Sequence, residues 1–208
     1  MINVSIAGIG GQGSVLAARI LAQAAEAKGW QVRSAETIGM AQRGGDVMSH
    51  VRMGNAGEEV FSPLPAKGTV DVLIALEPGE AARALPYLKE NGLLVVASTG
   101  IPPVMANFKR QTYDPQHLID DMQAAGVKMV VVDDAELVHR LGELKALNVM
   151  MLAYAIIAVN KREDCMDNAL RGAITLEDIE AAIPLCVKRK LVSVNEKAIK
   201  VVQQVARV

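Results

Sequence analysis

The sequence predicts an α/β fold, with a Rossmann-like, mostly parallel sheet, helices on both faces and a helical C-terminal extension. Two stretches, Val70–Leu76 and Leu93–Ala97, are apolar along almost their whole length, and segments with helical spacing separate the predicted strands. Such strands are typical of parallel sheets buried on both faces. The length fits one domain over residues 1–208, with its helical part at about 145–208.

The first predicted unit is a strand, a glycine turn and a helix. Asn3–Ala7 reads as a buried strand, Gly8–Gly13 as the turn, and Ser14–Lys28 as the helix. Glycines let the backbone turn sharply and approach a ligand, and the free N–H groups at a helix start attract anions. We therefore expect a negative or carbonyl-bearing group to bind here, although the glycines also suit close packing of strand and helix alone.

A dinucleotide site is one alternative for this turn. Gly8, Gly10 and Gly13 match the G-x-G-x-x-G pattern, and Glu36 lies where an acid would hold a ribose. The large polar side chain of Gln12 at the turn, and the Gly/Arg-rich loop that follows the second strand, argue against this alternative.

The middle of the chain is expected to continue the alternation. Gln31–Glu36 reads as the second strand, and Val47–Met53 has strand-like residues that we place at a sheet edge. Gly54–Gly68 is rich in turn formers and is expected to form a hairpin and a loop. Gly79–Lys89 reads as a helix, with a kink or break at Pro86.

The second half is predicted to be mainly helical. We expect a helix over Pro115–Ala125, a strand over Lys128–Val132, and helices over Lys145–Val159, from Thr175, and over Leu191–Val205. Lys145–Val159 is apolar all round, which predicts deep burial or contact with another subunit. Asp133 and Asp134 are expected to cap the helix that begins near Ala135, in preference to acid–base chemistry.

Composition excludes several classes of function. The net charge is −1, the pI is near 6.3 and only 3% of residues are aromatic, so we expect no nucleic-acid partner. The start Met1-Ile2-Asn3 lacks the pattern of a signal peptide, and no uninterrupted apolar run approaches about 18 residues, so we expect a cytoplasmic protein without a membrane span. Cys165 and Cys186 are too few and too far apart for an iron–sulfur cluster.

The sequence also lacks catalytic motifs of its own. We find no nucleophile elbow, no P-loop lysine and no metal-ligand spacing. His50 lies in an Arg-rich strand, where a structural role is favoured over chemistry. Glu77 follows a strand and precedes Pro78, and lining a pocket or capping the next helix are equally open to it.

A set of motifs in order resembles one family. Gly8–Gly13 is followed by Met40-Ala41-Gln42-Arg43-Gly44-Gly45, Ser49-His50-Val51-Arg52, Phe61-Ser62-Pro63-Leu64, Ala75-Leu76-Glu77-Pro78 and Ala146-Leu147-Asn148-Val149. This combination is similar to the gamma-type components of the 2-oxoacid:acceptor (ferredoxin) oxidoreductases. Within that family it is most similar to the beta subunits of indolepyruvate ferredoxin oxidoreductases. The likeness covers about three quarters of the chain, and the order and spacing of the motifs make it specific.

The resemblance implies a subunit that holds no cofactor itself. In this family thiamine diphosphate with Mg performs the decarboxylation and iron–sulfur clusters carry electrons to ferredoxin, and both are expected on a large partner subunit. Coenzyme A is expected as co-substrate of the complex. Consistently, Gly45-Asp46 is followed by Val47, so the thiamine motif Gly-Asp-Gly is absent. The chain alone is then expected to be inactive and to complete an active site that the partner holds.

Three alternatives stay open beside an indolepyruvate or arylpyruvate enzyme. Within the family, the substrate of the complex is alternatively pyruvate, 2-oxoglutarate or a branched-chain 2-oxoacid. From other classes, the chain is alternatively an NAD-binding oxidoreductase or a regulatory nucleotide-binding module.

We expect the face towards substrate, cofactor or partner to lie beyond the carboxyl ends of the first two strands. Within it, Arg43 would offer a two-pronged contact to an anion, and Gln12 a hydrogen bond. The candidate residues are Gly10, Gly11, Gln12, Gly13, Met40, Gln42, Arg43, Gly44, Gly45, His50 and Glu77.

Overall fold

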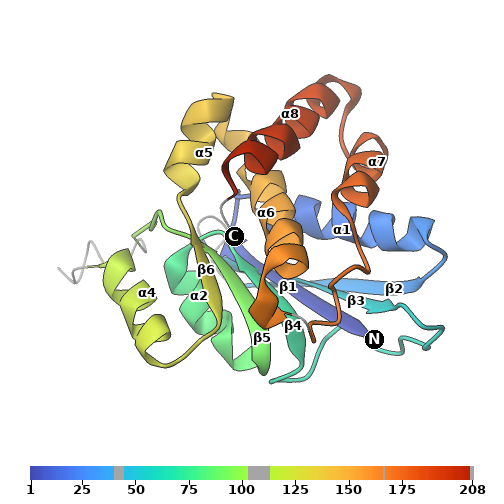
Figure 1. The fold of residues 1–208 in the computed structure, drawn as a ribbon, viewed down its shortest axis with the longest axis horizontal. Helices are drawn as coiled ribbons and strands as arrows, with labels where there is room; N and C mark the ends of the chain where they lie inside the picture. Colours follow the sequence, from blue (N-terminus) through green and yellow to red (C-terminus); the bar gives the residue numbers. More distant parts are fainter. Residues whose placement is uncertain (40–44, 103–112, 166, 207–208) are drawn as a thin grey trace.

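A six-stranded mixed sheet lies between two layers of helices in the computed structural model of the chain (Figure 1). The structure describes residues 1–39, 45–102, 113–165 and 167–206. The strands are β1 (Ile2–Ile9), β2 (Gln31–Ile38), β3 (Asp46–Gly54), β4 (Val70–Ala75), β5 (Leu88–Ala97) and β6 (Met129–Val132), in the spatial order β2-β3-β1-β4-β5-β6. β1, β4, β5 and β6 are parallel neighbours, whereas β3 is antiparallel to both β1 and β2. Five of the six described strands therefore point the same way.

The helices divide between the two faces of the sheet. The α-helices are α1 (Ser14–Ala27), α2 (Pro78–Ala84), α4 (Pro115–Ala124), α5 (Asp134–Leu141), α6 (Leu147–Lys161), α7 (Leu176–Cys186) and α8 (Arg189–Val205). Short 3-10 turns are η1 (Leu85–Tyr87), η2 (Leu144–Ala146) and η3 (Glu163–Cys165). One apolar core joins the sheet to α1, α5, α6, α7 and α8, and a smaller one joins the opposite face to α2 and α4 (Figure 1). The predicted fold class is thus confirmed, including the helical C-terminal part.

The apolar helix of the C-terminal part is the centre of the larger core. Every residue of α6 from Leu147 to Val159 is buried, which confirms the predicted deep burial. The segment Leu144–Lys161 is long and apolar enough to cross a membrane by length and composition, but 78% of it is buried inside the protein. This helix therefore serves as the core helix onto which α1, α7 and α8 pack.

Local signals placed the helix starts correctly. Thr175 and Asp178 form a reciprocal capping box at the start of α7, and Asp178 also pairs with Lys28 after α1 at 2.9 Å. Asp133 caps α5 by accepting from the N–H of Glu136 at 3.0 Å. Asp134 differs, because its carboxylate accepts instead from the N–H of Thr99 at 2.9 Å, and so ties the end of β5 to α5.

Three expectations for the middle of the chain were wrong. β3 is an interior strand between β2 and β1 and not an edge strand, and residues 55–69 hold a loop with no hairpin. The helix expected over Gly79–Lys89 ends earlier, at Ala84, and β5 begins at Leu88. The expected break at Pro86 is confirmed, because η1 with Pro86 follows the helix. α1 covers one face of β2 and β3. On the other face, His50 of β3 is buried beside Tyr87 of η1 and Met48 packs against the smaller core, whereas Arg33 and Thr37 of β2 are exposed.

The polar residues of β3 explain why the sequence did not predict its interior position. His50 lies opposite Ser5 of β1, and its Nδ1 lies 2.8 Å from the Ser5 hydroxyl. Arg52 lies opposite Asn3, and its Nε donates to Asn3 Oδ1 at 3.0 Å. Buried polar groups are tolerated when they are hydrogen-bonded, so these partners let a polar strand occupy the interior of the sheet.

Candidate functional site

The glycine turn between β1 and α1 has the backbone geometry that only glycine adopts easily. Gly11 has φ 105° and Gly13 has φ 85°, both in the left-handed region. Gly13 is the N-cap of α1 and brings no side chain to cap it. The first N–H groups of α1 therefore lack a capping side chain, as an anion-binding turn requires.

Gln12 connects the two central strands. Its Nε2 donates to the carbonyl of Leu76, beyond β4, at 2.9 Å, and its Oε1 accepts from the N–H of Ile9 at 2.7 Å. A Cβ at Gly8 would lie 2.9 Å from this Oε1, so glycine is needed there to make room. Gln12 thus holds the carboxyl ends of β1 and β4 together, and each polar atom of its amide already has a backbone partner.

A crevice opens where the chain direction switches. From β1 the chain crosses by α1 towards β2 on one face, and from β4 it crosses by α2 towards β5 on the other. Ligands in open α/β sheets bind at such switch points, beyond the carboxyl ends of the strands. A cavity of about 450 Å³ lies here, lined by Gly11, Gln12, Gly13, Leu16, Leu76, Thr99, Ile101, Asp134, Leu144, Lys145, Leu147 and Asn148.

Asn148 is the main polar group on the far wall of this crevice. It lies in the first turn of α6 and is 2% exposed, and its Nδ2 donates to the carbonyl of Gly13 at 2.9 Å. A Cβ at Gly13 would lie 2.7 Å from that nitrogen, so the close approach again requires glycine. The Oδ1 of Asn148 is buried and has no hydrogen-bond partner within the described residues. An unpaired buried acceptor is unusual, and here it belongs to a residue that lines the cavity.

Glu77 caps α2 and also binds the backbone of Ile101, in the segment after β5 that lines the crevice. It is 2% exposed, and its Oε2 accepts from the N–H of Glu80 at 2.9 Å, as the N-cap of α2. Its Oε1 accepts from the N–H of Ile101, which lines the crevice, and from the Tyr113 hydroxyl. Burial and this carboxylate raise the pKa of Tyr113. Of the two roles left open for Glu77, the structure supports capping.

His50 lies away from the crevice. Its side chain is 2% exposed and sits in the interior of the sheet, with the Tyr87 ring centroid 5.7 Å from its own. Burial lowers the pKa of His50. The neighbour Ser5 is four residues upstream of Ile9, where β1 ends, so His50 does not face the same space as the glycine turn.

The loop that carries Arg43 starts and ends beside the glycine turn. Gly10 donates its N–H to the carbonyl of Gly45 at 2.9 Å, and Gly39 donates to the carbonyl of Asp46 at 2.8 Å. Gly10 and Gly45, which the sequence places on one face, are therefore in contact at this end of the sheet. Four further candidates, Met40, Gln42, Arg43 and Gly44, lie outside the described residues.

The strand order also argues against a dinucleotide site. In the dinucleotide-binding fold the strand that supplies the ribose-binding acid lies directly beside the first strand. Here β3 separates β2, with Glu36, from β1, and Glu36 is exposed on the sheet edge. The turn has the glycine pattern, but the acid is displaced by one strand.

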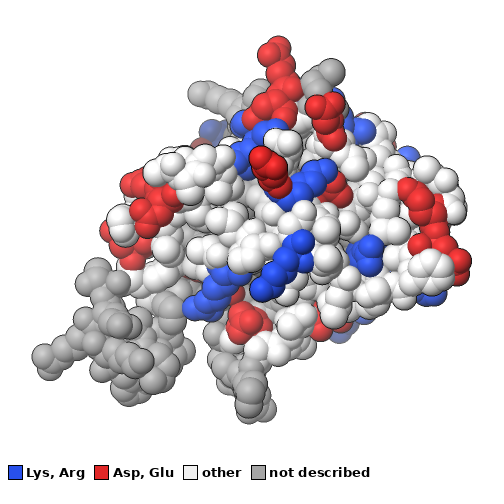
Figure 2. Space-filling model, turned by 90° about the horizontal axis from the view of Figure 1, so that it is seen from below, with Lys and Arg blue, Asp and Glu red and all other residues white. Residues whose placement is uncertain are grey.

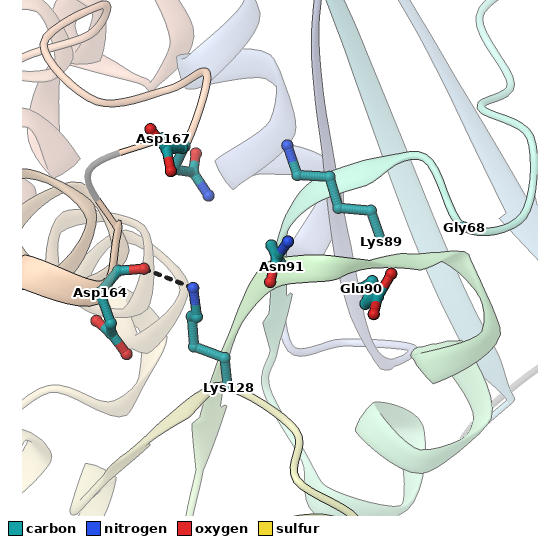
Figure 3. A pocket seen from close by; sticks show the side chains of 8 residues that line it. Gly68, Lys89, Glu90, Asn91, Lys128, Asp164 and Asp167 are labelled. Atoms are coloured by element: carbon teal, nitrogen blue, oxygen red, sulfur yellow. Dashed lines mark hydrogen bonds between the residues drawn. The ribbon is translucent and has the colours of Figure 1, made fainter.

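A larger cavity of about 490 Å³ lies at the opposite, amino-terminal edge of the strands (Figure 3). Its two lysines already have partners, because Lys89 pairs with Asp71 and Lys128 donates to the carbonyl of Asp164. Asp164 and Asp167 also line it, which makes the cavity a poor anion site. We therefore place the functional site at the switch-point crevice.

The described residues hold no cluster of three potential metal ligands. Cys165 is buried and Cys186 half-buried, and burial raises the pKa of both thiols. Thiols with raised pKa values stay protonated and are poor nucleophiles and ligands. Asn148 is the residue that reasoning from the sequence missed, although it stands in the Ala146–Val149 motif.

Comparisons with known proteins agree with this architecture. The family model "Pyruvate ferredoxin/flavodoxin oxidoreductase" matches residues 3–207. The chain is 32% identical over 200 residues to the indolepyruvate oxidoreductase subunit IorB of Archaeoglobus fulgidus, which covers 96% of this chain and 92% of that protein. It superposes on the gamma subunit of a keto/oxoacid ferredoxin oxidoreductase from Geobacter sulfurreducens with a TM-score of 0.66, at 22% identity, covering 99% of this chain and 98% of that one.

A third relative is longer. The 2-oxoglutarate:ferredoxin oxidoreductase of Magnetococcus marinus, solved with 2-oxoglutarate, coenzyme A and succinyl-CoA bound, matches 99% of this chain but only 31% of its own, with a TM-score of 0.69 and 15% identity. The family model and the IorB relative show that the chain belongs to the pyruvate ferredoxin/flavodoxin oxidoreductase family. Within it, the chain is a small, gamma-type subunit of a 2-oxoacid:ferredoxin oxidoreductase.

Proposed function

We propose that this chain completes the active site of an indolepyruvate-type, or arylpyruvate, ferredoxin oxidoreductase. The complex would oxidatively decarboxylate the 2-oxoacid, join the acyl group to coenzyme A and pass the electrons to ferredoxin. The observation that carries the choice of substrate is the 32% identity to an indolepyruvate oxidoreductase subunit along nearly the whole chain. Thiamine diphosphate, Mg and the iron–sulfur clusters would belong to a large partner subunit, since two separated cysteines cannot supply four cluster ligands.

Within this enzyme the crevice is proposed to hold part of coenzyme A. Its walls are apolar at Leu16, Leu76 and Leu147, which suits the uncharged arm of that co-substrate. The open Oδ1 of Asn148 can accept from an amide or amino N–H, and the uncapped start of α1 favours a phosphate. Coenzyme A is bound in the Magnetococcus relative, which supports this choice of ligand.

Arg43 stays part of the proposal as an anion-binding residue. Its loop joins the β2 and β3 ends, and the Gly10–Gly45 hydrogen bond fixes the base of that loop beside the crevice. A guanidinium there would make a two-pronged contact with a carboxylate or phosphate of substrate, cofactor or partner.

The test is co-purification of the chain with its large partner, followed by acyl-CoA assays on a panel of 2-oxoacids. Indolepyruvate and phenylpyruvate should give the highest kcat/KM. A preference for pyruvate, 2-oxoglutarate or 2-oxoisovalerate would keep the family and change the substrate. A failure to associate with any thiamine- and cluster-bearing subunit would contradict the proposed function itself.

A further inference from the structure

Two large apolar side chains face solvent on the loop between β3 and β4. Phe61 is 83% exposed and Leu64 is 51% exposed, although Val60 and Pro65 beside them are buried. The backbone of this loop is therefore anchored on the protein at both sides, while these two side chains point outward. Exposed aromatic and aliphatic groups that stand together are typical of binding sites for other proteins.

The loop is held by Arg52. Its Nη1 donates to the carbonyl of Ser62 at 2.8 Å and to that of Leu64 at 3.4 Å, and its Nε donates to Asn3 Oδ1. Asn3 in turn donates from Nδ2 to the carbonyl of Thr69 at 2.9 Å. Because β1 and β3 supply both anchors, the loop is already ordered before any partner binds, and binding loses less conformational entropy.

This loop stands at one end of the sheet face opposite α1. By register, Arg33 and Thr37 of β2 and Met48, His50 and Arg52 of β3 belong to that face; the two β2 side chains are exposed, whereas His50 is buried beside Tyr87. A groove of about 180 Å³ separates the strands from α2 and η1, with Thr37 and Met48 on one wall and Tyr87 on the other. Seen from the side of α2 and α4, the molecule carries its basic residues along the middle and its acidic residues mainly near the margins (Figure 2).

We propose that Phe61 and Leu64, with the exposed side chains Arg33 and Thr37 of β2, dock the large partner subunit. This inference rests on the proposed function, which supplies the partner. In the Magnetococcus relative, the fold of this chain makes up only 31% of a longer chain, so there the rest of an oxidoreductase is joined covalently to the same fold. The complementary surface would be an apolar recess for the Phe61 ring with one carboxylate placed to pair with Arg33, because Arg33 is exposed and has no ion-pair partner among the described residues.

The experiment measures assembly of the co-expressed two-subunit complex, with dissociation constants for the parent chain, Phe61→Ser and Leu64→Ser. Leu185→Ser is the matched control, because Leu185 is 70% exposed on α7, on the other side of the sheet. We expect each loop variant to bind at least tenfold more weakly, Leu185→Ser to bind within twofold of the parent, and Phe61→Tyr to retain most of the affinity. Unchanged melting temperatures of the isolated variants would exclude misfolding as the cause.

The outcomes separate the two ideas. If the parent chain does not assemble with the thiamine- and cluster-bearing subunit, the proposed function is wrong. If the parent assembles and the Phe61 and Leu64 variants bind within twofold of it, the docking surface is wrong and the proposed function stands. Equal weakening by Leu185→Ser would also overturn the docking surface, since the effect would then not be specific to the loop.

Discussion

At the scale of single residues, the contact between Asn148 and Gly13 makes the crevice. The amide nitrogen of Asn148 holds the glycine turn, and the oxygen of the same side chain is buried without a hydrogen-bond partner among the described residues. Both requirements explain why glycine stands at position 13, since any Cβ there would collide with the amide. The residue that binds the turn is thus the same one for which we propose a contact with the ligand.

Asn148→Ala should raise the KM for coenzyme A of the assembled enzyme by about ten- to hundredfold. Loss of a hydrogen bond that leaves a buried partner unsatisfied costs about 1–3 kcal/mol. The matched control is Asn195→Ala, because Asn195 is also buried, donates to a helix carbonyl and has an open Oδ1, but lies in α8 away from the crevice. Steady-state kinetics at varied concentrations of coenzyme A measure both KM values. Equal changes in the two variants would show that Asn148 does not bind coenzyme A.

Arg43→Lys should impair the complex while leaving the isolated chain folded. Lysine keeps the charge but loses the planar fork, and a charged hydrogen bond contributes about 1.5–3 kcal/mol, or roughly ten- to hundredfold in rate or affinity. Arg140→Lys is the control, because Arg140 is half-exposed and pairs only along α5 with Glu136. Turnover and assembly within twofold of the parent for both variants would contradict a functional Arg43.

The free energy of unfolding should decrease as the pH falls from about 7 to 5, in part because of His50. Burial lowers the pKa of His50 below its ordinary value of 6.5, so the unfolded chain binds more protons than the folded one just below that pH. Stability then rises with pH in this window and is lost on acidification. Burial raises the pKa of Glu80, which acts in the opposite direction but does so equally in parent and variant.

Urea unfolding at several pH values tests this expectation. The decrease in the free energy of unfolding between pH 7 and 5 should be smaller in His50→Gln than in the parent. His139→Gln, at an exposed position of α5, should keep the slope of the parent. Identical slopes in all three proteins would show that His50 does not contribute.

At the scale of elements, the site depends on how the ends of β1 and β4 are joined. Gly8→Ala should destabilise the chain by about 1–3 kcal/mol, because the new methyl would press on Gln12 Oε1 and on Leu76. Its cost should fall by at least about 0.5 kcal/mol when Gln12 is also replaced by Ala, since one of the two obstacles is then gone. A double-mutant cycle of unfolding free energies measures this coupling, and strictly additive costs would mean that Gln12 does not hold the strands.

The unexpected interior position of β3 has a physical reason. β3 carries His50 and Arg52, and polar residues in a strand predict an exposed position. Partners on β1, Ser5 and Asn3, satisfy them and allow an interior one. Those partners are more than forty residues away in the sequence, so no local pattern reveals them.

At the scale of the whole molecule, the chain is built to work inside a complex. Its crevice is lined by the turn after β1, by α1, by residues that follow β4 and β5, and by α5, η2 and α6. In the proposed function, this chain supplies binding groups and orientation to chemistry that a cofactor on the partner carries.

The isolated chain should therefore bind NAD weakly at most, and it should show no oxidoreductase activity. Gln12 occupies the gap between β1 and β4, and β3 moves Glu36 away from the position where an acid would hold the ribose. Calorimetry with NAD and NADP measures the first part, and assays with 2-oxoacids and an artificial acceptor measure the second. Binding in the micromolar range or tighter, or turnover by the purified chain, would favour the stand-alone oxidoreductase.

Sequence alone determined whatever depends on neighbours along the chain. The apolar run of β4, the buried length of α6, the capping box at Thr175 and the left-handed glycines of the turn all follow from local periodicity, capping chemistry and backbone sterics. The tertiary structure alone decided the rest: the insertion of β3 beside β1, and the meeting of Asn148 with Gly13 across 135 positions. Such contacts form only when distant segments bury a common core, because their energy comes from packing and from satisfying buried polar groups, which no single stretch of sequence encodes.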